Sequence, residues 1–160
     1  MKITQLQDHP EVVGLLAQWH GAQWRHLYPG WNAAEAQRQF ELETSDGGIP
    51  RTWIALYNER LLGSVSLIRD DLPGRPSQNP WLASMLVAEN ERGQGIGKRL
   101  VETVLAWSDT RNIAEIFLFT ENQTSFFARF GFFPIEQTMQ NGHAITIMKR
   151  STPLLHTNNR

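Results

Sequence analysis

The chain has 160 residues, of which 41% are hydrophobic and none is cysteine, and its formal net charge is −1. This length suits one domain, predicted over residues 1–150, and the near-neutral charge gives no electrostatic reason to expect nucleic acid or an anionic membrane as a partner. Without cysteine, disulfides, cysteine-ligated metals and an acyl-cysteine intermediate are excluded, and the sequence predicts no metal site.

The N-terminal segment is predicted to form a short strand followed by two helices. The strand covers residues 3–6, and Asp8 is placed to cap a helix that extends toward Leu27. Asn32 is placed to cap the second helix, over residues 33–42. No apolar run here or later is long enough to span a membrane, and the N-terminus lacks the apolar stretch of a leader, so we expect a cytoplasmic protein.

Two strands and two loops are predicted next. The strands cover residues 53–57 and 61–68 and are joined by a tight turn at 58–60. Polar segments that contain glycine and proline predict loops at residues 45–50 and 70–80. The second loop leads into the part of the chain that says most about function.

A strand-to-helix junction carries three glycines at alternate positions. Residues 81–87 (WLASMLV) form an apolar run that predicts a buried strand, and Ile96, Leu100 and Val104 then recur at helical spacing. Between them the sequence is Arg92-Gly93-Gln94-Gly95-Ile96-Gly97-Lys98. The first N–H groups of a helix lack intrahelical partners, and the helix dipole favours negative charge there, so these glycines predict a site for a phosphate or pyrophosphate group.

Two common phosphate-binding motifs do not fit this spacing. A dinucleotide fingerprint requires G-x-G-x-x-G, whereas Gly93 to Gly97 follow G-x-G-x-G. A P-loop requires four residues between its glycines and a Ser or Thr after its lysine, but here three residues intervene and Arg99 follows Lys98. A nucleotide-binding protein with a degenerate P-loop therefore stays only as an alternative.

The remaining chain is predicted to complete a sheet. The glycine-rich helix is followed by a strand, a short helix and two closing strands, over residues 115–119, 122–130, 132–136 and 144–149. Asn141-Gly142 predicts a tight hairpin between the closing strands, and residues 151–160 are predicted to be a flexible tail. This order of elements predicts an α/β fold with a mixed sheet.

Two motifs at a fixed separation point to a known family. The run Arg92 to Gly97 has the form RGxGIG, and Thr120-Glu121-Asn122 is followed by Phe126 to Phe132, which ends in a Gly-Phe pair. With one helix and one strand between them, the two motifs resemble the acyl-CoA loop and the later Asn and Gly-Phe segment of the GCN5-related N-acetyltransferases. The resemblance covers roughly the second half of the chain. It implies the acyl-CoA N-acyltransferase fold, with a mixed, mostly antiparallel central sheet flanked by helices.

The resemblance also implies an activity and a donor site. It implies an acetyl-CoA-dependent N-acetyltransferase that transfers the acetyl group directly to a primary amine, with acetyl-CoA and an amine-bearing acceptor as partners and a homodimer as an open option. The pyrophosphate would be held by Arg92, Gly93, Gln94, Gly95, Ile96, Gly97 and Lys98. The pantetheine arm would pair with the main chain of Met85, Leu86 and Val87. A backbone N–H near Leu86 would face the thioester oxygen.

Two residues of the later motif each carry two interpretations. Asn122 matches the family residue that hydrogen-bonds the pantetheine arm, and it is an equally good cap for the helix that follows. Phe127 stands where many relatives carry a tyrosine whose hydroxyl protonates the departing sulfur. A phenylalanine has no such proton, so it packs either on the cofactor or in the core. A thiol with a pKa near ~8.5 can still leave as thiolate.

The sequence specifies the catalytic residues less well than the donor site. The strand at 81–87 contains no carboxylate, so the candidates are Ser84, acting through an ordered water, and Glu121. Glu121 is otherwise a surface acid in the first turn of a helix. The region of the first helix offers two second-choice bases and an aromatic wall for an amine, namely His20, His26, Trp24 and Trp31.

The missing tyrosine and the missing base leave a second function open. The chain can instead be a non-catalytic acyl-CoA-binding module or sensor. Binding of acetyl-CoA without transfer to any amine would favour that alternative over the enzyme.

Overall fold

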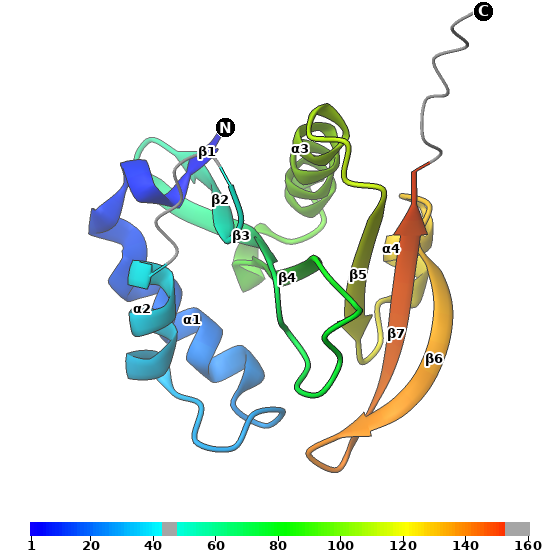
Figure 1. Ribbon diagram of the computed structural model, residues 1–160. Coiled ribbons are helices and arrows are strands. Elements are labelled where there is room, and N and C mark those ends of the chain that lie inside the picture. Colours follow the sequence, from blue (N-terminus) through cyan, green and yellow to red (C-terminus); the bar gives the residue numbers. More distant parts are fainter. Residues whose placement is uncertain (43–47, 153–160) are drawn as a thin grey trace, which may run out of the picture.

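The computed structural model describes residues 1–42 and 48–152, and the described strands form one seven-stranded sheet (Figure 1). The strand order is β1-β2-β3-β4-β5-β7-β6, and all neighbouring strands are antiparallel except β4 and β5. The strands are β1 (Lys2–Gln5), β2 (Arg51–Tyr57), β3 (Arg60–Ile68), β4 (Trp81–Val87), β5 (Glu115–Thr120), β6 (Phe133–Gln140) and β7 (His143–Ser151). The α-helices are α1 (Val13–Trp24), α2 (Ala33–Leu42), α3 (Ile96–Thr110) and α4 (Thr124–Ala128).

Helices cover both faces of the sheet, because successive side chains of a strand point to opposite faces. In β2, Trp53 and Ala55 are buried in one hydrophobic cluster with Leu100 of α3. Ile54 lies between them in sequence and is buried in another cluster with Leu16 of α1. The first cluster includes α4 and the second includes α2, so the helices pack in two pairs on opposite faces. The predicted α/β fold, with a mostly antiparallel sheet flanked by helices, is confirmed.

The first helix begins later than predicted. Two short 3₁₀ turns precede it, and α1 starts only at Val13, with no side-chain hydrogen bond at its cap. The backbone of His9, at φ −136° and ψ 60°, leaves the helical path between the two turns. The predicted cap at Asp8 is therefore wrong.

Three other local predictions are confirmed. The Asn32 side-chain oxygen accepts a hydrogen bond from the Glu35 N–H at 2.9 Å and caps α2. The turn between β2 and β3 has positive φ at Asn58 (46°) and Glu59 (66°), as a two-residue hairpin requires. Asn141-Gly142 has φ values of 48° and 79° and joins β6 to β7 in the same way.

β4 contains a bulge next to its centre. In its pairing with β3, Ser64 lies opposite Leu86 but Ser66 lies opposite Ala83, so β4 carries one extra residue. Ser84, inside the bulge, has a φ of +54°. This left-handed conformation is uncommon for a residue with a side chain, and such strain is often concentrated at functional sites.

β4 and β5 part toward their C-terminal ends. The registered pairing of these parallel strands is confined to Trp81 and Phe117, and the strands diverge beyond it (Figure 1). β4 leads to the glycine-rich segment, and β5 leads to Thr120-Glu121. Both sequence motifs therefore begin at the diverging ends of one strand pair.

The C-terminal elements differ from the prediction in length. α4 begins at Thr124 with Gln123 at its cap position, so the predicted helix over 122–130 is too long. The alternative that Asn122 caps this helix is wrong. β6 and β7 are longer than predicted, because they stay paired up to the tight turn that joins them and β7 pairs with β5 as far as Ser151.

Two predicted segments lie partly outside the residues that the structure describes. Residues 45–47 of the predicted loop and residues 153–160 of the predicted tail fall outside the described residues, whereas Ser151 belongs to β7. None of the described helices combines the length and the apolar composition that a membrane span requires.

Candidate active site

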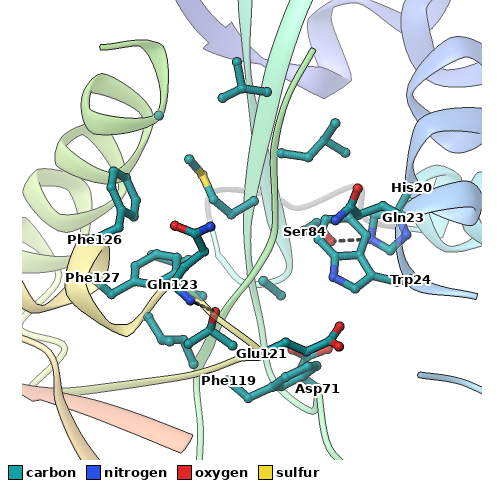
Figure 2. Close-up of a pocket in the computed structure, with 18 of the residues that line it drawn as sticks. His20, Gln23, Trp24, Asp71, Ser84, Phe119, Glu121, Gln123, Phe126 and Phe127 are labelled. Carbon is teal, nitrogen blue, oxygen red and sulfur yellow. Dashed lines mark hydrogen bonds between the residues drawn. The ribbon is translucent and has the colours of Figure 1, made fainter. Parts of the chain in front are cut away.

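A cavity of about 890 Å³ lies where β4 and β5 diverge. It is lined by β4, the start of α3, β5 and α4, and Phe126 and Phe127 of α4 lie across from His20 and Trp24 of α1 (Figure 2). The end of α1, the segment after it and the loop between β3 and β4 enclose the remaining side. Segments from most of the chain thus meet around one space.

Charged side chains are unevenly distributed along the cavity. One end, next to α3 and α4, is called the loop end here, and its basic residues are Arg92, Lys98 and Arg129. The opposite end, next to α1, is called the α1 end, and its carboxylates are Asp70, Asp71 and Glu121. Glu91 also lines the cavity, but it is ion-paired with Arg60. The cavity therefore suits an anionic group at the loop end and a cationic group at the α1 end.

The loop end is built mainly from backbone. Gly93 and Gly95 have φ values of 80° and 81°, and a Cβ at either would have nothing within 4 Å. Gly95 is the N-cap of the 15-residue α3, and no side chain caps this helix. Free N–H groups in open space at a helix N-terminus bind phosphate groups well. Of the predicted loop residues, Gln94 alone does not line the cavity, and its side-chain amide donates to Glu91 Oε2 at 3.4 Å.

Gly97 brings α3 close to its neighbours. A Cβ at this position would lie 2.8 Å from the terminal methyl of Met85 and 3.5 Å from the Phe126 ring. The missing side chain therefore lets the first turn of α3 pack against β4 and α4. Its role is close packing, whereas the other two glycines of the motif supply positive φ.

The end of β4 faces the gap without a strand partner on the β5 side. Met85, Leu86 and Val87 line the cavity, and the registered pairing with β5 stops at Trp81. The Arg92 Nε–H donates to the Val87 carbonyl at 3.1 Å and ties the glycine loop to the strand. A free strand edge of this kind can take an extended, amide-containing chain as an added strand. The pantetheine arm of coenzyme A is such a chain, so these residues fit the predicted donor.

A chain of three hydrogen-bonded side chains lies at the bulge. The Trp31 indole N–H donates to His20 Nδ1 at 3.2 Å, and His20 Nε2 lies 2.8 Å from Ser84 Oγ (Figure 2). An indole can only donate, so the neutral imidazole carries its proton on Nε2 and donates it to Ser84. Burial lowers the pKa of His20 to about 4, which keeps the ring neutral. His20 therefore orients Ser84 and does not take its proton.

A carboxyl group with altered acidity lies in the loop between β3 and β4. Burial raises the pKa of Asp71 to about 7, even though the Tyr28 hydroxyl donates to its Oδ1 at 2.9 Å. Burial and the neighbouring carboxyl also raise the pKa of Tyr28, so this hydroxyl stays protonated. A carboxyl of this acidity is half ionised near neutral pH, which suits a general base.

Glu121, a catalytic candidate from the sequence, lies at the α1 end of the cavity. Its Oε1 lies 2.6 Å from His26 Nε2, and about a third of each side chain is exposed, at 34% and 37%. The two residues named as separate candidates from the sequence therefore form one pair. The predicted aromatic wall is also present at this end, where Trp24 and Trp31 line the cavity and Tyr28 and Phe119 extend it.

The two predicted residues of the later motif lie on the cavity wall in different ways. Asn122 lines the cavity and is exposed. Phe127 lines the cavity but is only 6% exposed, and its ring packs edge-on against Phe126 at 5.0 Å and Phe132 at 6.1 Å between centroids. The Phe127 ring therefore both packs in the core and lines the cavity.

Sequence reasoning missed two features of the site. Asp71 and Tyr28 were not candidates, because Asp71 follows another aspartate in a polar loop and nothing local separates the two. The left-handed conformation of Ser84 also has no signal in the sequence. A buried acid can be found only when the fold shows which groups surround it.

Solved structures share this fold at low sequence identity. An aminoglycoside 6′-N-acetyltransferase complexed with coenzyme A matches with a TM-score of 0.73 and 15% identity, over 94% of this chain and 97% of that chain. An acetyltransferase of the GNAT family from Staphylococcus aureus Mu50 matches with a TM-score of 0.69 and 20% identity, over 94% and 98%. At these identities the likeness shows the fold alone.

Sequence comparisons identify the family. N-acetyltransferase 8B of Homo sapiens is 34% identical over 70 residues, which cover 44% of this chain and 31% of that protein, so the match spans about a third of the relative's length. The family model described as Acetyltransferase (GNAT) family matches residues 16–132, a range that contains both motifs. Acetyl-CoA, the predicted co-substrate, is the donor of that family. Because the matched residues are well over half of the sequence, the chain belongs to the acetyltransferase (GNAT) family.

Proposed function

We propose that the protein is an acetyl-CoA-dependent N-acetyltransferase that transfers the acetyl group to a primary amine by direct attack. The observation that carries this proposal is one cavity with a main-chain anion site at one end and three carboxylates at the other. A donor that carries a pyrophosphate and an acceptor that carries an ammonium group fit these opposite ends, so their reacting atoms would meet near the β4 bulge. The chain has no cysteine, and His20 donates to Ser84 rather than activating it, which argues against a covalent intermediate.

The donor is proposed to bind along the loop end and β4. The first N–H groups of α3 and the charges of Arg92 and Lys98 would hold the pyrophosphate. The main chain of residues 85–87 would pair with the pantetheine arm, and Asn122 and Phe127 would contact it from the other wall. A backbone N–H near Leu86 is the proposed donor to the thioester oxygen, where negative charge develops during attack.

Asp71 is proposed as the base and Glu121 as the residue that holds the acceptor. A raised pKa near 7 lets Asp71 take a proton from an ammonium group at neutral pH. The neutral nitrogen then attacks the thioester carbonyl carbon, the C–S bond breaks, and the sulfur keeps the electron pair as thiolate. The nitrogen, which is positively charged after the attack, loses its second proton to the thiolate or to solvent, which leaves the neutral amide and coenzyme A. Glu121, at the exposed edge of the cavity, would orient the amine through a charge-assisted hydrogen bond.

Ser84 is proposed to position the amine or a water beside the thioester. Its oxygen already accepts the His20 proton, so one lone pair and its own proton remain for a ligand. Phe127 supplies no proton to the sulfur, and a thiol with a pKa near ~8.5 needs only modest help to leave as thiolate.

A ligand test addresses the donor. The thermal midpoint of the protein is measured with acetyl-CoA, coenzyme A and ATP, because a ligand at 100 times its dissociation constant adds about 2.7 kcal/mol. We expect both coenzyme A forms to stabilise the protein and ATP to have a much smaller effect. Stabilisation by ATP alone would support the nucleotide-binding alternative and contradict the proposal.

An acceptor test separates the enzyme from the sensor. Thiol release from acetyl-CoA is measured with a panel of amines: simple alkylamines, diamines, an aminoglycoside, lysine and peptide N-termini. Because the α1 end carries carboxylates and aromatic rings, amines with a second positive charge should have the highest kcat/KM. The aminoglycoside is included because a structural relative is an aminoglycoside acetyltransferase. Binding of acetyl-CoA with no turnover of any amine would favour the non-catalytic module.

A further inference from the structure

Three side chains with metal-ligand chemistry meet at the outer edge of the α1 end. One nitrogen each from His26 and His143 and one carboxylate oxygen from Glu121 lie within 4.8 Å of one another. His26 Nε2 is 2.6 Å from Glu121 Oε1, and the two imidazole rings are 4.8 Å apart at 82°. Within residues 1–42 and 48–152, this is the one group of three such side chains.

The three residues come from distant parts of the chain, and other contacts hold that part of the backbone in place. His26 follows α1, Glu121 follows β5, and His143 is the first residue of β7. The Asn141 side-chain amide donates to the His26 carbonyl at 2.8 Å, and that of Gln140 donates to the Leu27 carbonyl at 3.0 Å. The tip of the β6–β7 hairpin is therefore fastened to the segment after α1 without any help from the three side chains.

This arrangement lowers the conformational-entropy cost of binding an ion. The backbone positions of His26 and His143 are already set by the hairpin contacts, so an ion would need to fix only side-chain rotamers. About a third of the His26 and Glu121 side chains is exposed, so an ion can reach them from solvent. Small rotamer changes would suffice to bring the three ligand atoms to a common distance from one ion.

The ligand types select the class of ion. Two imidazoles and one carboxylate suit a borderline-soft divalent cation, whereas Mg²⁺ and Ca²⁺ prefer oxygen ligands throughout. Zn²⁺ takes a set of two histidines and one glutamate and leaves a fourth position for water. We propose that His26, Glu121 and His143 bind one divalent cation of the Zn²⁺ class at the edge of the acceptor end of the cavity.

The proposed ion would inhibit acetyl transfer. Glu121 belongs both to this group and to the cavity wall, so a bound cation would take the carboxylate that the acceptor amine needs. Its positive charge would also repel an ammonium group at short distance. Inhibition should therefore be competitive with the amine and not with acetyl-CoA. This consequence rests on the proposed function, whereas the binding of the ion does not.

Binding is tested without reference to activity. Chelator-treated protein is titrated with Zn²⁺ and, separately, with Mg²⁺ by isothermal calorimetry. We expect one Zn²⁺ per chain and no measurable Mg²⁺ binding. His143→Gln should weaken Zn²⁺ binding by at least about tenfold, since even residues that only orient a metal ligand carry that much affinity. His9→Gln is the matched control, because His9 lies 3.0 Å from Glu11 in a similar pair but has no second histidine beside it in the described residues.

Activity supplies the second readout. His143→Gln should keep the transfer rate of the original protein in the presence of a chelator and should lose its inhibition by Zn²⁺. Product formation is followed by mass spectrometry, because the thiol of released coenzyme A itself binds Zn²⁺. The proposal is overturned by absence of Zn²⁺ binding, by equal binding of Mg²⁺, or by equal weakening in the His143→Gln and His9→Gln variants. An inactive protein that still binds Zn²⁺ through His143 would refute the proposed function alone.

Discussion

The two ends of the cavity are built from different parts of the polypeptide. The loop end uses main chain: two glycines at positive φ, the uncapped N-terminus of α3 and a free strand edge at residues 85–87. The α1 end uses side chains that are hydrogen-bonded in pairs, Ser84 with His20 and Asp71 with Tyr28. The main-chain groups of the loop end are close together in sequence, whereas the side chains of the α1 end come from distant segments.

This difference predicts which kinds of substitution should disrupt the function of each end of the cavity. Main-chain groups cannot be deleted by substitution, so the loop end should be lost only when a side chain or a charge is added where there is none. The α1 end depends on acidity and on hydrogen-bond direction, so isosteric substitutions should change turnover and pH dependence while acetyl-CoA affinity stays constant.

Gly95→Glu should abolish donor binding. The substitution puts a carboxylate at the helix N-terminus, where the pyrophosphate is expected, and repulsion at short distance should weaken acetyl-CoA binding by at least about 100-fold. Calorimetric titration with acetyl-CoA measures the effect. Gly74→Glu is the control, because Gly74 has a similar φ of 78° and open space around it but does not line the cavity. Unchanged affinity in Gly95→Glu would remove the glycine loop from the donor site.

The same division explains what sequence reasoning could and could not find. The glycine loop and the strand before it were predictable, because their chemistry depends on local spacing and backbone conformation. The N-cap at Asn32 was predictable for the same reason, although Asp8 shows that a capping residue is not used when the next residue leaves the helical path. Asp71 was not predictable, because its raised pKa comes from burial, and its hydrogen-bond partner Tyr28 lies 43 positions away in sequence.

Asp71→Asn should lower kcat by about 100-fold or more, the usual contribution of a general base. Acetyl-CoA affinity should not change, because Asp71 lies at the opposite end of the cavity from the loop. In the unsubstituted protein, kcat/KM should rise with pH through about 7 as Asp71 ionises. In the variant, kcat/KM should not show this rise. Initial rates across pH 5.5–8.5, a window of roughly one and a half units on either side of that value, give both readouts.

Two comparisons make the Asp71 test specific. Asp70→Asn changes the neighbouring carboxylate on the same cavity wall and should cost far less activity, since no hydrogen bond to Tyr28 fixes it in place. Glu121→Gln should mainly raise KM for the amine, as expected for a residue that holds the acceptor. If Asp70→Asn lowers activity as much as Asp71→Asn does, catalysis does not depend on the raised pKa of Asp71.

The stability of the α1 end should depend on pH in two opposite ways. Asp71 has a pKa of about 7 when folded and ~3.9 when unfolded, so the folded state binds more protons in that window and stability falls as pH rises through it. His20 has a pKa of about 4 when folded and ~6.5 when unfolded, so the unfolded state binds more protons and stability rises with pH. In the intact protein the two effects partly cancel.

Single substitutions should separate these effects. Relative to the unsubstituted protein, Asp71→Asn should gain about 4 kcal/mol between pH 4 and pH 8, and His20→Gln should lose about 3 kcal/mol over the same range. Urea unfolding at several pH values measures the change, and differences that do not vary with pH are ignored because each substitution also alters packing. Parallel curves for all three proteins would show that neither group titrates differently in the folded state.

Phe127→Tyr should give the smallest change, a few-fold in turnover at most. The substitution adds a hydroxyl to a ring that packs against Phe126 and Phe132 and also lines the cavity. If the ring faces the departing sulfur, the new hydroxyl can protonate the sulfur as the C–S bond breaks and should raise kcat; acetyl-CoA affinity should be unchanged. If the hydroxyl is instead buried without a partner, the free energy of unfolding should drop by about 1–3 kcal/mol with no gain in rate. That result would assign Phe127 to the core, and only the backbone around it to the donor site.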